Sequence, residues 1–290
     1  MKHKLEILVN SNDIHILIPT YNRIDQIKKT INSVINQTYQ GWLLTIIDNN
    51  SSDNTVEILK NEYKDLIKKK KIIIKPFSNF VNQATNWNRC IEYAGNYRYF
   101  KLLCSDDVLD KNFLLIAKEE LDTTDASVAG FSSDINYIDI NDKYIGTRAY
   151  GFFGLELWVS IFYRNYIGTP SSQLLKTNFF KNSEYTSVSY GGDLLYIVDY
   201  CYSKNKKLVF HNSPLVNFRF WKDSDSFKNY GKQSMVDGRS RCRKIMIKKI
   251  FKKKIVSVFF NAVSNFLFYI ETIFFGVIIF FKYLFKKKYD

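Results

Sequence analysis

Four short apolar runs divide the first part of the chain. They span residues 14–18, 43–47, 72–74 and 99–103, and the first three begin 29 residues apart. Runs that lack an alternation of apolar and polar residues are typical of strands covered on both faces. The pattern therefore predicts a buried sheet built from repeated units of similar size.

Amphipathic helices are predicted between these strands. Apolar residues three and four positions apart share one face within residues 24–35, and again within residues 56–63. Asp53 precedes the second of these helices, where a carboxylate can cap the first turn. Strands that alternate with helices in this way predict an α/β domain with a parallel sheet.

Polar residues follow three of the four predicted strands. They occupy residues 19–23, 48–53 and 105–107. In parallel α/β sheets, ligands bind beyond the carboxyl ends of the strands. We therefore expect the three polar clusters to meet at one edge of the sheet and to form the site of the chemistry.

The regular alternation of strands and helices ends near residue 125. Later segments predict a mixture of helices and strands, at residues 152–163, 171–175, 194–202 and 215–220. No linker rich in Gly, Pro or Ser separates this part from the first. We therefore interpret residues 1–125 and 126–238 as two halves of one domain.

Basic residues are concentrated in a C-terminal tail, residues 239–290. The whole chain carries a formal net charge of +14, and the 13 Lys and Arg of the tail, less Glu271 and Asp290, account for +11 of it. Proteins that bind nucleic acid usually spread basic residues over the surface that meets the phosphates. We therefore expect no nucleic-acid partner and interpret the tail as a local anchor.

The tail has the composition of a helix that associates with a membrane. Residues 255–281 are rich in Phe, Ile and Val, and basic clusters flank them. A basic residue close to an anionic membrane surface contributes about 1 kcal/mol. Glu271 interrupts the apolar run, which favours an interfacial or re-entrant helix over a single span. The alternative is an amphipathic helix that docks on the domain itself, or on a second copy in a homodimer.

Cysteine usage and the N-terminal sequence favour a cytoplasmic location. The four cysteines lie far apart without a C-x-x-C pair, which indicates neither a zinc site nor a disulfide framework. Residues 1–10 lack the apolar core of a signal peptide. Together with the basic tail, these features predict a protein at the cytoplasmic face of the inner (plasma) membrane.

Three motifs follow one another in the first part of the chain, Ile16-Leu-Ile-Pro-Thr-Tyr-Asn-Arg23, Ile46-Ile-Asp-Asn-Asn-Ser-Ser-Asp53 and Leu103-Cys-Ser-Asp-Asp107. They resemble the signature of family 2 glycosyltransferases. Asn86-Trp-Asn-Arg-Cys90 resembles a bacterial surface-polysaccharide branch of that family, and the likeness covers residues 12–222. The resemblance implies a Rossmann-like GT-A fold, an α/β fold with a mixed, mainly parallel sheet flanked by helices. It also implies an inverting transfer from a nucleoside diphosphate sugar, with Mn²⁺ or Mg²⁺ as cofactor.

The resemblance assigns roles to individual residues. Those that would bind the nucleotide sugar are Pro19, Thr20, Tyr21, Arg23, Asp48, Asn88, Asp106 and Arg219. Asp106 and Asp107 would hold the divalent cation, which stabilises the charge that grows on the leaving diphosphate. Cys104 stands where many members have a further aspartate, and Trp221 stands where His is frequent. Taken alone, the aspartate pair could also start the next helix, and Arg219 could pair with a structural carboxylate.

Asp193 is the candidate general base. An inverting transfer needs a group that takes the proton from the acceptor hydroxyl as this hydroxyl attacks the sugar. Asp193 follows Gly191 and Gly192, whose backbone can approach a substrate closely, and it matches the family's acceptor-side Gly-Asp motif. The alternative is that Asp193 caps the helix that begins there. Asp199 is a weaker candidate, because it falls on nearly the opposite face of that helix.

These features predict an inverting glycosyltransferase that extends a lipid-linked oligosaccharide for a bacterial surface polysaccharide, such as O-antigen or capsule. Residues 1–125 would bind the nucleotide sugar, usually a uridine diphosphate (UDP) sugar in this family. Residues 126–238 would bind the acceptor, and residues 239–290 would contact the membrane. One alternative is a nucleotidyltransferase, although residues 19–23 lack the Gly-rich loop of that class. Another is a catalytically silent scaffold, suggested by Cys104 and Trp221.

Overall fold

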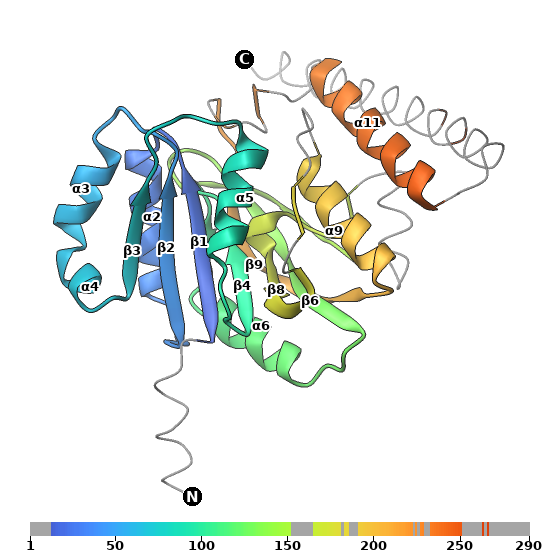
Figure 1. Ribbon diagram of the computed structural model, residues 1–290, viewed down its shortest axis with the longest axis horizontal. Helices are drawn as coiled ribbons and strands as arrows, with labels where there is room; N and C mark the ends of the chain where they lie inside the picture. The colour runs from blue at the N-terminus through green and yellow to red at the C-terminus, as the bar shows by residue number, and fades with distance from the viewer. Residues whose placement is uncertain are drawn as a thin grey trace, which may run out of the picture.

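The computed structural model describes residues 13–151, 165–180, 183–185, 191–222 and 233–250, and the single residues 224, 227, 228, 263 and 266. Within this part of the chain, nine strands form one mixed sheet with helices on both faces (Figure 1). The predicted α/β class is confirmed.

The first half of the sheet is parallel, as the apolar runs predict. Its strands pair in the order β3-β2-β1-β4, with bounds β1 (Ile14–Thr20), β2 (Trp42–Asp48), β3 (Ile72–Pro76) and β4 (Tyr99–Leu102). The helices between them are α2 (Ile24–Ile35), α3 (Thr55–Glu62), α4 (Lys64–Lys68) and α5 (Gln83–Tyr93). This topology places the carboxyl ends of β1, β2 and β4 at one edge of the sheet.

The second half of the sheet is mixed. Its elements are β5 (Val108–Leu109), α6 (Phe113–Asp122), β6 (Val128–Ile138), β7 (Tyr144–Arg148), the 3₁₀ turn η1 (Pro170–Ser172), β8 (Gln173–Lys176), α8 (Thr177–Phe180), α9 (Gly192–Ser203) and β9 (Lys207–Arg219). The strands continue from β4 in the order β8-β6-β9-β5, with β7 beside β6, and β6 and β9 run parallel. The apolar pattern did not predict β6, because the buried polar residues Ser132, Ser133 and Asp134 interrupt its sequence.

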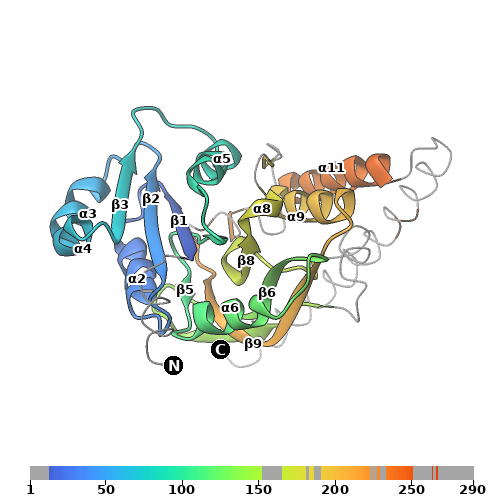
Figure 2. The same cartoon turned by 60° about the horizontal axis from the view of Figure 1, so that its bottom comes forward.

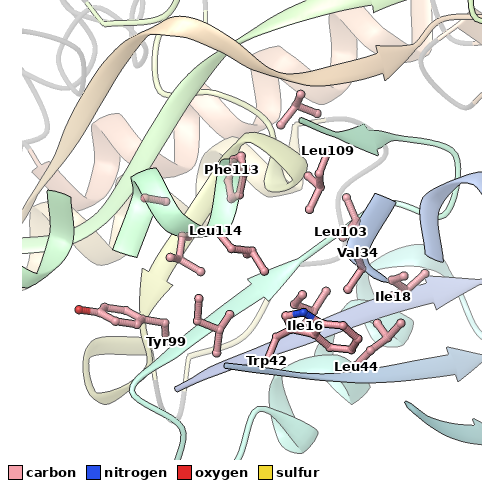
Figure 3. Packing of buried hydrophobic residues seen from close by; sticks show 14 of the residues in the cluster. Ile16, Ile18, Val34, Trp42, Leu44, Tyr99, Leu103, Leu109, Phe113 and Leu114 are labelled. Carbon is pink, nitrogen blue, oxygen red and sulfur yellow. The ribbon is translucent and has the colours of Figure 1, made fainter. Parts of the chain in front are cut away.

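Separate hydrophobic clusters cover the two faces of the sheet. Along β1, Ile14, Ile16 and Ile18 face the cluster that includes α2 and α6. Leu17 faces the cluster that includes α5 and α9. Figure 2 shows these helices on the two sides of the sheet, and Figure 3 shows the first cluster, with Phe113 of α6 packed on the side that Ile16 faces. Burial on both faces explains why the strand sequences lack alternation.

The helix α11 (Gln233–Ile250) contains the start of the predicted tail and packs against α9 (Figure 1). Cys242, Met246 and Ile247 share one face of α11 and are buried in the cluster that includes α9. The folded helix thus begins before the expected boundary at residue 239, because its apolar face has a partner within the domain.

Most of the predicted tail lies outside the described residues. Beyond Ile250 the structure describes only residues 263 and 266, and the predicted segment 152–163 falls outside it as well. The membrane contact therefore stays a prediction. Among the helices that the structure does describe, none combines the length and the apolar character needed to cross a membrane.

His15 is a buried titratable residue of β1. Its Nε2 accepts a hydrogen bond from the Thr45 hydroxyl (2.8 Å), and its Nδ1 donates to the Ala94 carbonyl (3.3 Å), an arrangement that suits a neutral imidazole. Burial lowers the pKa of His15 from 6.5 to about 4. The neutral ring is therefore the form that the fold accommodates.

Replacing His15 by glutamine should make the free energy of unfolding depend less on pH below pH 6.5. Because the pKa is lower in the folded state, His15 stabilises the fold above pH 6.5, and this contribution is lost as the pH falls toward 4. Over this interval the unchanged protein should lose up to about 3 kcal/mol more unfolding free energy than the His15→Gln variant. Urea unfolding at a series of pH values measures the difference. If the unchanged protein and the variant lose the same unfolding free energy as the pH falls, the expectation is contradicted.

Candidate active site

The first two polar clusters meet where β1 and β2 end. Thr20 and Asp48 are partners in the register of these parallel strands. The loops beyond them are tied together, because the Asn22 N–H donates to Ser51 Oγ (2.9 Å) and the Ser52 N–H donates to Asn22 Oδ1 (2.8 Å). Asn22 has a φ of 51°, a left-handed conformation that Asn adopts more readily than most residues. The predicted convergence of these clusters is therefore observed.

Two buried oxygen atoms mark this edge of the sheet. Asp48 is 2% exposed, and its Oδ2 accepts the Ser51 N–H (3.0 Å). Asp48 Oδ1 and Thr20 Oγ1 are buried too, and neither has a hydrogen-bond partner among the described residues. Buried polar atoms normally have partners. These two oxygens therefore favour a ligand that brings its own donors, such as the N–H group of a nucleobase.

Asp53 connects the starts of two helices. Its Oδ1 accepts the Thr55 N–H (3.2 Å), and its Oδ2 accepts the Ile24 N–H (3.3 Å). The N-cap of α3 is Asn54, which has a left-handed φ of 58°. Asp53 thus lies one position before the N-cap, but its carboxylate caps the first turn of α3, as predicted. It also fixes the loop after β2 relative to α2.

A loop at residues 77–82 borders the same edge, and two residues that the sequence did not single out hold it. Asn49 accepts the Val81 N–H (3.0 Å) and donates to the Val81 carbonyl (2.8 Å), as the backbone of a neighbouring strand would. Arg89 donates to Asn49 Oδ1 (3.0 Å) and lies 4.0 Å from the centroid of the Phe77 ring. Asn49 and Arg89 belong to two of the motifs quoted above. No spacing in the sequence indicates that they hold the loop at residues 77–82.

Tyr21 and Phe80 form an exposed aromatic pair at this edge. Their ring centroids are 4.7 Å apart, and the residues are 43% and 58% exposed. Exposed apolar residues that lie together often mark a binding site, and aromatic faces stack well on planar bases. The position of Tyr21 therefore suits its predicted role beside the nucleoside, and Phe80 is an additional candidate.

Arg23 and Trp221 meet across the site. The Arg23 guanidinium lies 5.1 Å from the centroid of the Trp221 ring, a cation–π geometry. Trp221 Nε1 in turn lies 3.4 Å from Asp106 Oδ2. Trp221, which stands where the family often has His, thus links the first motif to the aspartate pair. Pro19 lies one position before the end of β1 and pairs in register with Ile47.

The two adjacent aspartates have different environments. Asp107 is 1% exposed, and its Oδ1 accepts the backbone N–H of Arg219 (3.0 Å). Burial and the charge of Asp106 raise the pKa of Asp107 to about 8. Asp106 is only partly buried, so solvent can reach its carboxylate. The next helix begins at Phe113, so the pair does not start it. Asp107 therefore anchors the loop, and Asp106 is the less buried residue of the pair.

The aspartate pair fits a divalent cation that also binds the substrate. Burial and the charge of Asp106 disfavour the ionised form of Asp107 and raise its pKa, and a cation beside the pair would favour the ionised form. The described residues contain no cluster of three or more His, Cys, Asp or Glu side chains that could hold a metal ion. Mg²⁺ and similar ions commonly take one or two carboxylates together with substrate phosphates. The donor set therefore suits an ion that arrives with a diphosphate.

Asp193 and the aspartate pair all act electrostatically on Cys104. Asp193 is in the first turn of α9, after Gly191, whose φ of +84° favours glycine. Because Asp193 lies inside the helix, it is not the N-cap. Burial raises the pKa of the Cys104 thiol, and the charges of Asp107 and Asp106 raise it further. The charge of Asp193 raises it as well, so the three carboxylates act on one small region.

Two residues predicted to bind the donor are engaged by the protein itself. Arg219 is 1% exposed, and its guanidinium donates to the carbonyls of Asp106 (2.9 Å) and Asp139 (2.8 Å). The Asn88 amide donates to the Tyr185 carbonyl (3.1 Å) and accepts the Tyr185 N–H (2.6 Å). These bonds favour supporting roles, and for Arg219 they favour the alternative of structural partners. A contact of either residue with the donor stays a prediction.

Residues 15–183, more than half of the chain, match glycosyl transferase family 2. The chain belongs to this family. The matched stretch contains the ends of β1, β2 and β4 with their motifs, and it stops before Asp193. The predicted resemblance is confirmed.

Curated relatives in the family match this chain over a shorter stretch. The chain is 33% identical over 102 residues to UDP-Glc:alpha-D-GlcNAc-diphosphoundecaprenol beta-1,3-glucosyltransferase WfgD of Escherichia coli, which covers 35% of this chain and 38% of that protein. It is 30% identical over 101 residues to the putative teichuronic acid biosynthesis glycosyltransferase TuaG of Bacillus subtilis, with the same coverage. The matched stretch thus spans little more than a third of either relative.

Solved structures of glycosyltransferases share the fold over most of the chain. TarS of S. aureus in complex with UDP-GlcNAc superposes with a TM-score of 0.65 at 14% identity, covering 88% of this chain and 71% of that one. The mannosyltransferase PcManGT of Pyrobaculum calidifontis in complex with GDP-Man and Mn²⁺ gives a TM-score of 0.60 at 10% identity, covering 88% and 69%. These similarities confirm the GT-A fold.

Proposed function

We propose that this family member is an inverting glycosyltransferase that moves a sugar from a UDP sugar to a hydroxyl of a lipid-linked saccharide. The observation that carries the proposal is that the charges of Asp106, Asp107 and Asp193 all act on Cys104, just after β4, whose carboxyl end lies with those of β1 and β2 at one edge of the sheet. Such a transfer needs one set of groups at the leaving diphosphate and another at the attacking hydroxyl. The aspartate pair after β4 would supply the groups at the diphosphate, and Asp193 of α9 would act at the hydroxyl.

The nucleoside is proposed to bind between the ends of β1 and β2. Asp48 Oδ1 would accept an N–H of the base, and the exposed rings of Tyr21 and Phe80 would stack beside it. A UDP sugar is supported by the relatives, since WfgD is named for UDP-Glc and TarS was solved with UDP-GlcNAc.

A divalent cation, Mn²⁺ or Mg²⁺, is the proposed cofactor, with Asp106 as its protein ligand. When bound, the ion would stabilise the negative charge that develops on the leaving diphosphate. Asp107 would hold the loop in place through the Arg219 N–H. The complex of PcManGT with Mn²⁺ supports the use of such an ion.

Asp193 is the proposed general base. One of its carboxylate oxygens would take the proton of the acceptor hydroxyl while the hydroxyl oxygen bonds to the anomeric carbon and the bond from that carbon to the diphosphate breaks. Its place in the first turn of α9 suits this role, since the N-terminal end of a helix stabilises an ionised carboxylate.

A lipid-linked acceptor is the proposed substrate. WfgD and WfaP are both named for an acceptor linked to diphosphoundecaprenol, and TuaG is named for teichuronic acid biosynthesis. Such a substrate fits an enzyme that extends a bacterial surface polysaccharide at the inner face of the plasma membrane.

Thermal unfolding with a panel of nucleotide sugars tests the donor. A UDP sugar at a hundred times its Kd should stabilise the fold by about 2.7 kcal/mol, and most of this gain should require Mn²⁺. The Asp48→Asn variant should lose much of the gain, because an amide nitrogen replaces one of the acceptor oxygens. A nucleoside triphosphate that stabilises in place of the UDP sugar would favour a nucleotidyltransferase. Binding without transfer or hydrolysis would favour a silent scaffold.

A further inference from the structure

The turn between β6 and β7 is connected to the aspartate pair through one arginine. The backbone N–H of Arg219 donates to Asp107 Oδ1 (3.0 Å), and its Nε donates to the Asp106 carbonyl (2.9 Å). Its Nη1 reaches the carbonyls of Asp139 (2.8 Å) and Ile140 (3.3 Å) in the turn. The turn and the aspartate loop are thus fixed to the same buried side chain.

Asp142 completes the connection. Its Oδ1 lies 2.5 Å from Arg219 Nη2, and its Oδ2 lies 2.5 Å from Lys29 Nζ on α2. Burial alone would raise the pKa of Asp142, but Lys29 and Arg219 outweigh this effect and lower it. The carboxylate is therefore ionised at neutral pH and bridges two cations from different parts of the fold.

The turn that carries Asp142 is internally bonded. Asp139 Oδ1 accepts the N–H groups of Asn141 (2.8 Å) and Lys143 (2.9 Å). Asp142 itself has a left-handed φ of 66°. An Asp side chain commonly fixes a turn by accepting hydrogen bonds from backbone N–H groups a few residues later in the chain. Asp142 is therefore presented to Arg219 from a defined position.

The buried Arg219 charge pairs with Asp142 and also acts on Asp107. Arg219 is 1% exposed, and a buried cation without a partner is strongly destabilising. Asp142 supplies the ion pair recorded for its guanidinium in the described part of the chain. Without Asp142, the guanidinium would be drawn toward the carboxylates of Asp106 and Asp107, where it would compete with a divalent cation.

We propose that Asp142 is a positioning residue for the Asp106–Asp107 loop. By pairing with Arg219, it fixes the loop against the turn between β6 and β7. The same pair offsets the arginine charge beside Asp106, the carboxylate proposed to receive the cation. This inference rests on the proposed donor site, and it assigns a function to a residue outside all three motifs.

Calorimetric binding of UDP and of uridine tests the proposal. In the presence of Mn²⁺, Asp142→Asn should weaken UDP binding about tenfold, as is typical when a partner that orients a metal ligand is lost. Uridine has no phosphates and should bind the variant as well as it binds the unchanged protein. Asp142→Glu should restore part of the affinity for UDP. Asn141→Ala, a change on the same turn beside Asp142, is the matched control and should bind UDP normally.

Equal UDP affinity in Asp142→Asn and the unchanged protein would overturn the positioning role. A loss that affects uridine as strongly as UDP would also overturn it, because it would indicate a general disturbance of the fold. If the unchanged protein binds neither ligand, the proposed donor site itself is wrong, and the inference falls with it. Uridine binding distinguishes a general disturbance of the fold from a lost positioning role. Binding by the unchanged protein tests the proposed donor site itself.

Discussion

Replacing Asp193 by asparagine should lower kcat about a thousandfold while leaving donor affinity unchanged. A general base typically contributes a factor of roughly 10²–10⁴, and asparagine keeps the size of the side chain but cannot take the acceptor proton. Asp193 lies on α9, whereas the proposed nucleoside site lies at the ends of β1 and β2. The KM for the UDP sugar should therefore stay within about twofold. Release of UDP at saturating donor and acceptor measures the effect.

Asp199 provides a matched control for this experiment. It lies on the same helix, about 120° around the helix axis from Asp193, so Asp199→Asn should transfer sugar at close to the normal rate. Near-normal turnover by Asp193→Asn would contradict the assignment and show that another group takes the proton. A rise in KM with an unchanged kcat would instead point to a role in binding.

Replacing Asp106 by asparagine should abolish the dependence of UDP binding on Mn²⁺ and lower kcat/KM about a thousandfold. A metal that stabilises the leaving diphosphate supplies several kcal/mol, and about 1.4 kcal/mol corresponds to each factor of ten. Asp107 cannot easily take over, because it is buried and its Oδ1 holds the Arg219 N–H. Titration of UDP binding with Mn²⁺, together with the transfer assay, measures both effects.

Asp110 is the control for a lost carboxylate in the same region. It is exposed just after β5, and its Oδ1 accepts the Asn112 N–H (2.8 Å), so Asp110→Asn should change neither cation dependence nor turnover. UDP binding by Asp106→Asn that still requires Mn²⁺ would refute Asp106 as the ligand. It would direct attention to Asp107.

The first half of the fold was predictable because its signals are local. Apolar runs without alternation mark strands buried on both faces, and Ile16 and Leu17 do face opposite clusters. Parallel strands end at one edge, so the polar residues after β1 and β2 had to meet there, as Thr20 and Asp48 do. Sequence alone was sufficient for this part of the candidate site.

The second half depends on contacts that no local pattern encodes. The strand β6 carries Ser132 and Ser133 in the core, so its sequence does not resemble a buried strand. Arg219 was expected to bind the donor because its segment resembles one found near the active site in the family. Its partners are backbone carbonyls and Asp142, which are distant in the chain. No local pattern in the sequence indicates that Asp193 and the aspartate pair act on the same residue, Cys104.

The bond between Asp107 and Arg219 also bears on how the protein assembles. These residues are 112 positions apart in the chain, so the loop that carries Asp107 is completed by a strand synthesised long after it. Contacts between such distant segments form late, because a long loop must close first. A nascent chain that has reached β4 can already pair β1, β2 and β3 and build the edge proposed for the nucleoside. The aspartate loop acquires its final support only after Arg219 has left the ribosome.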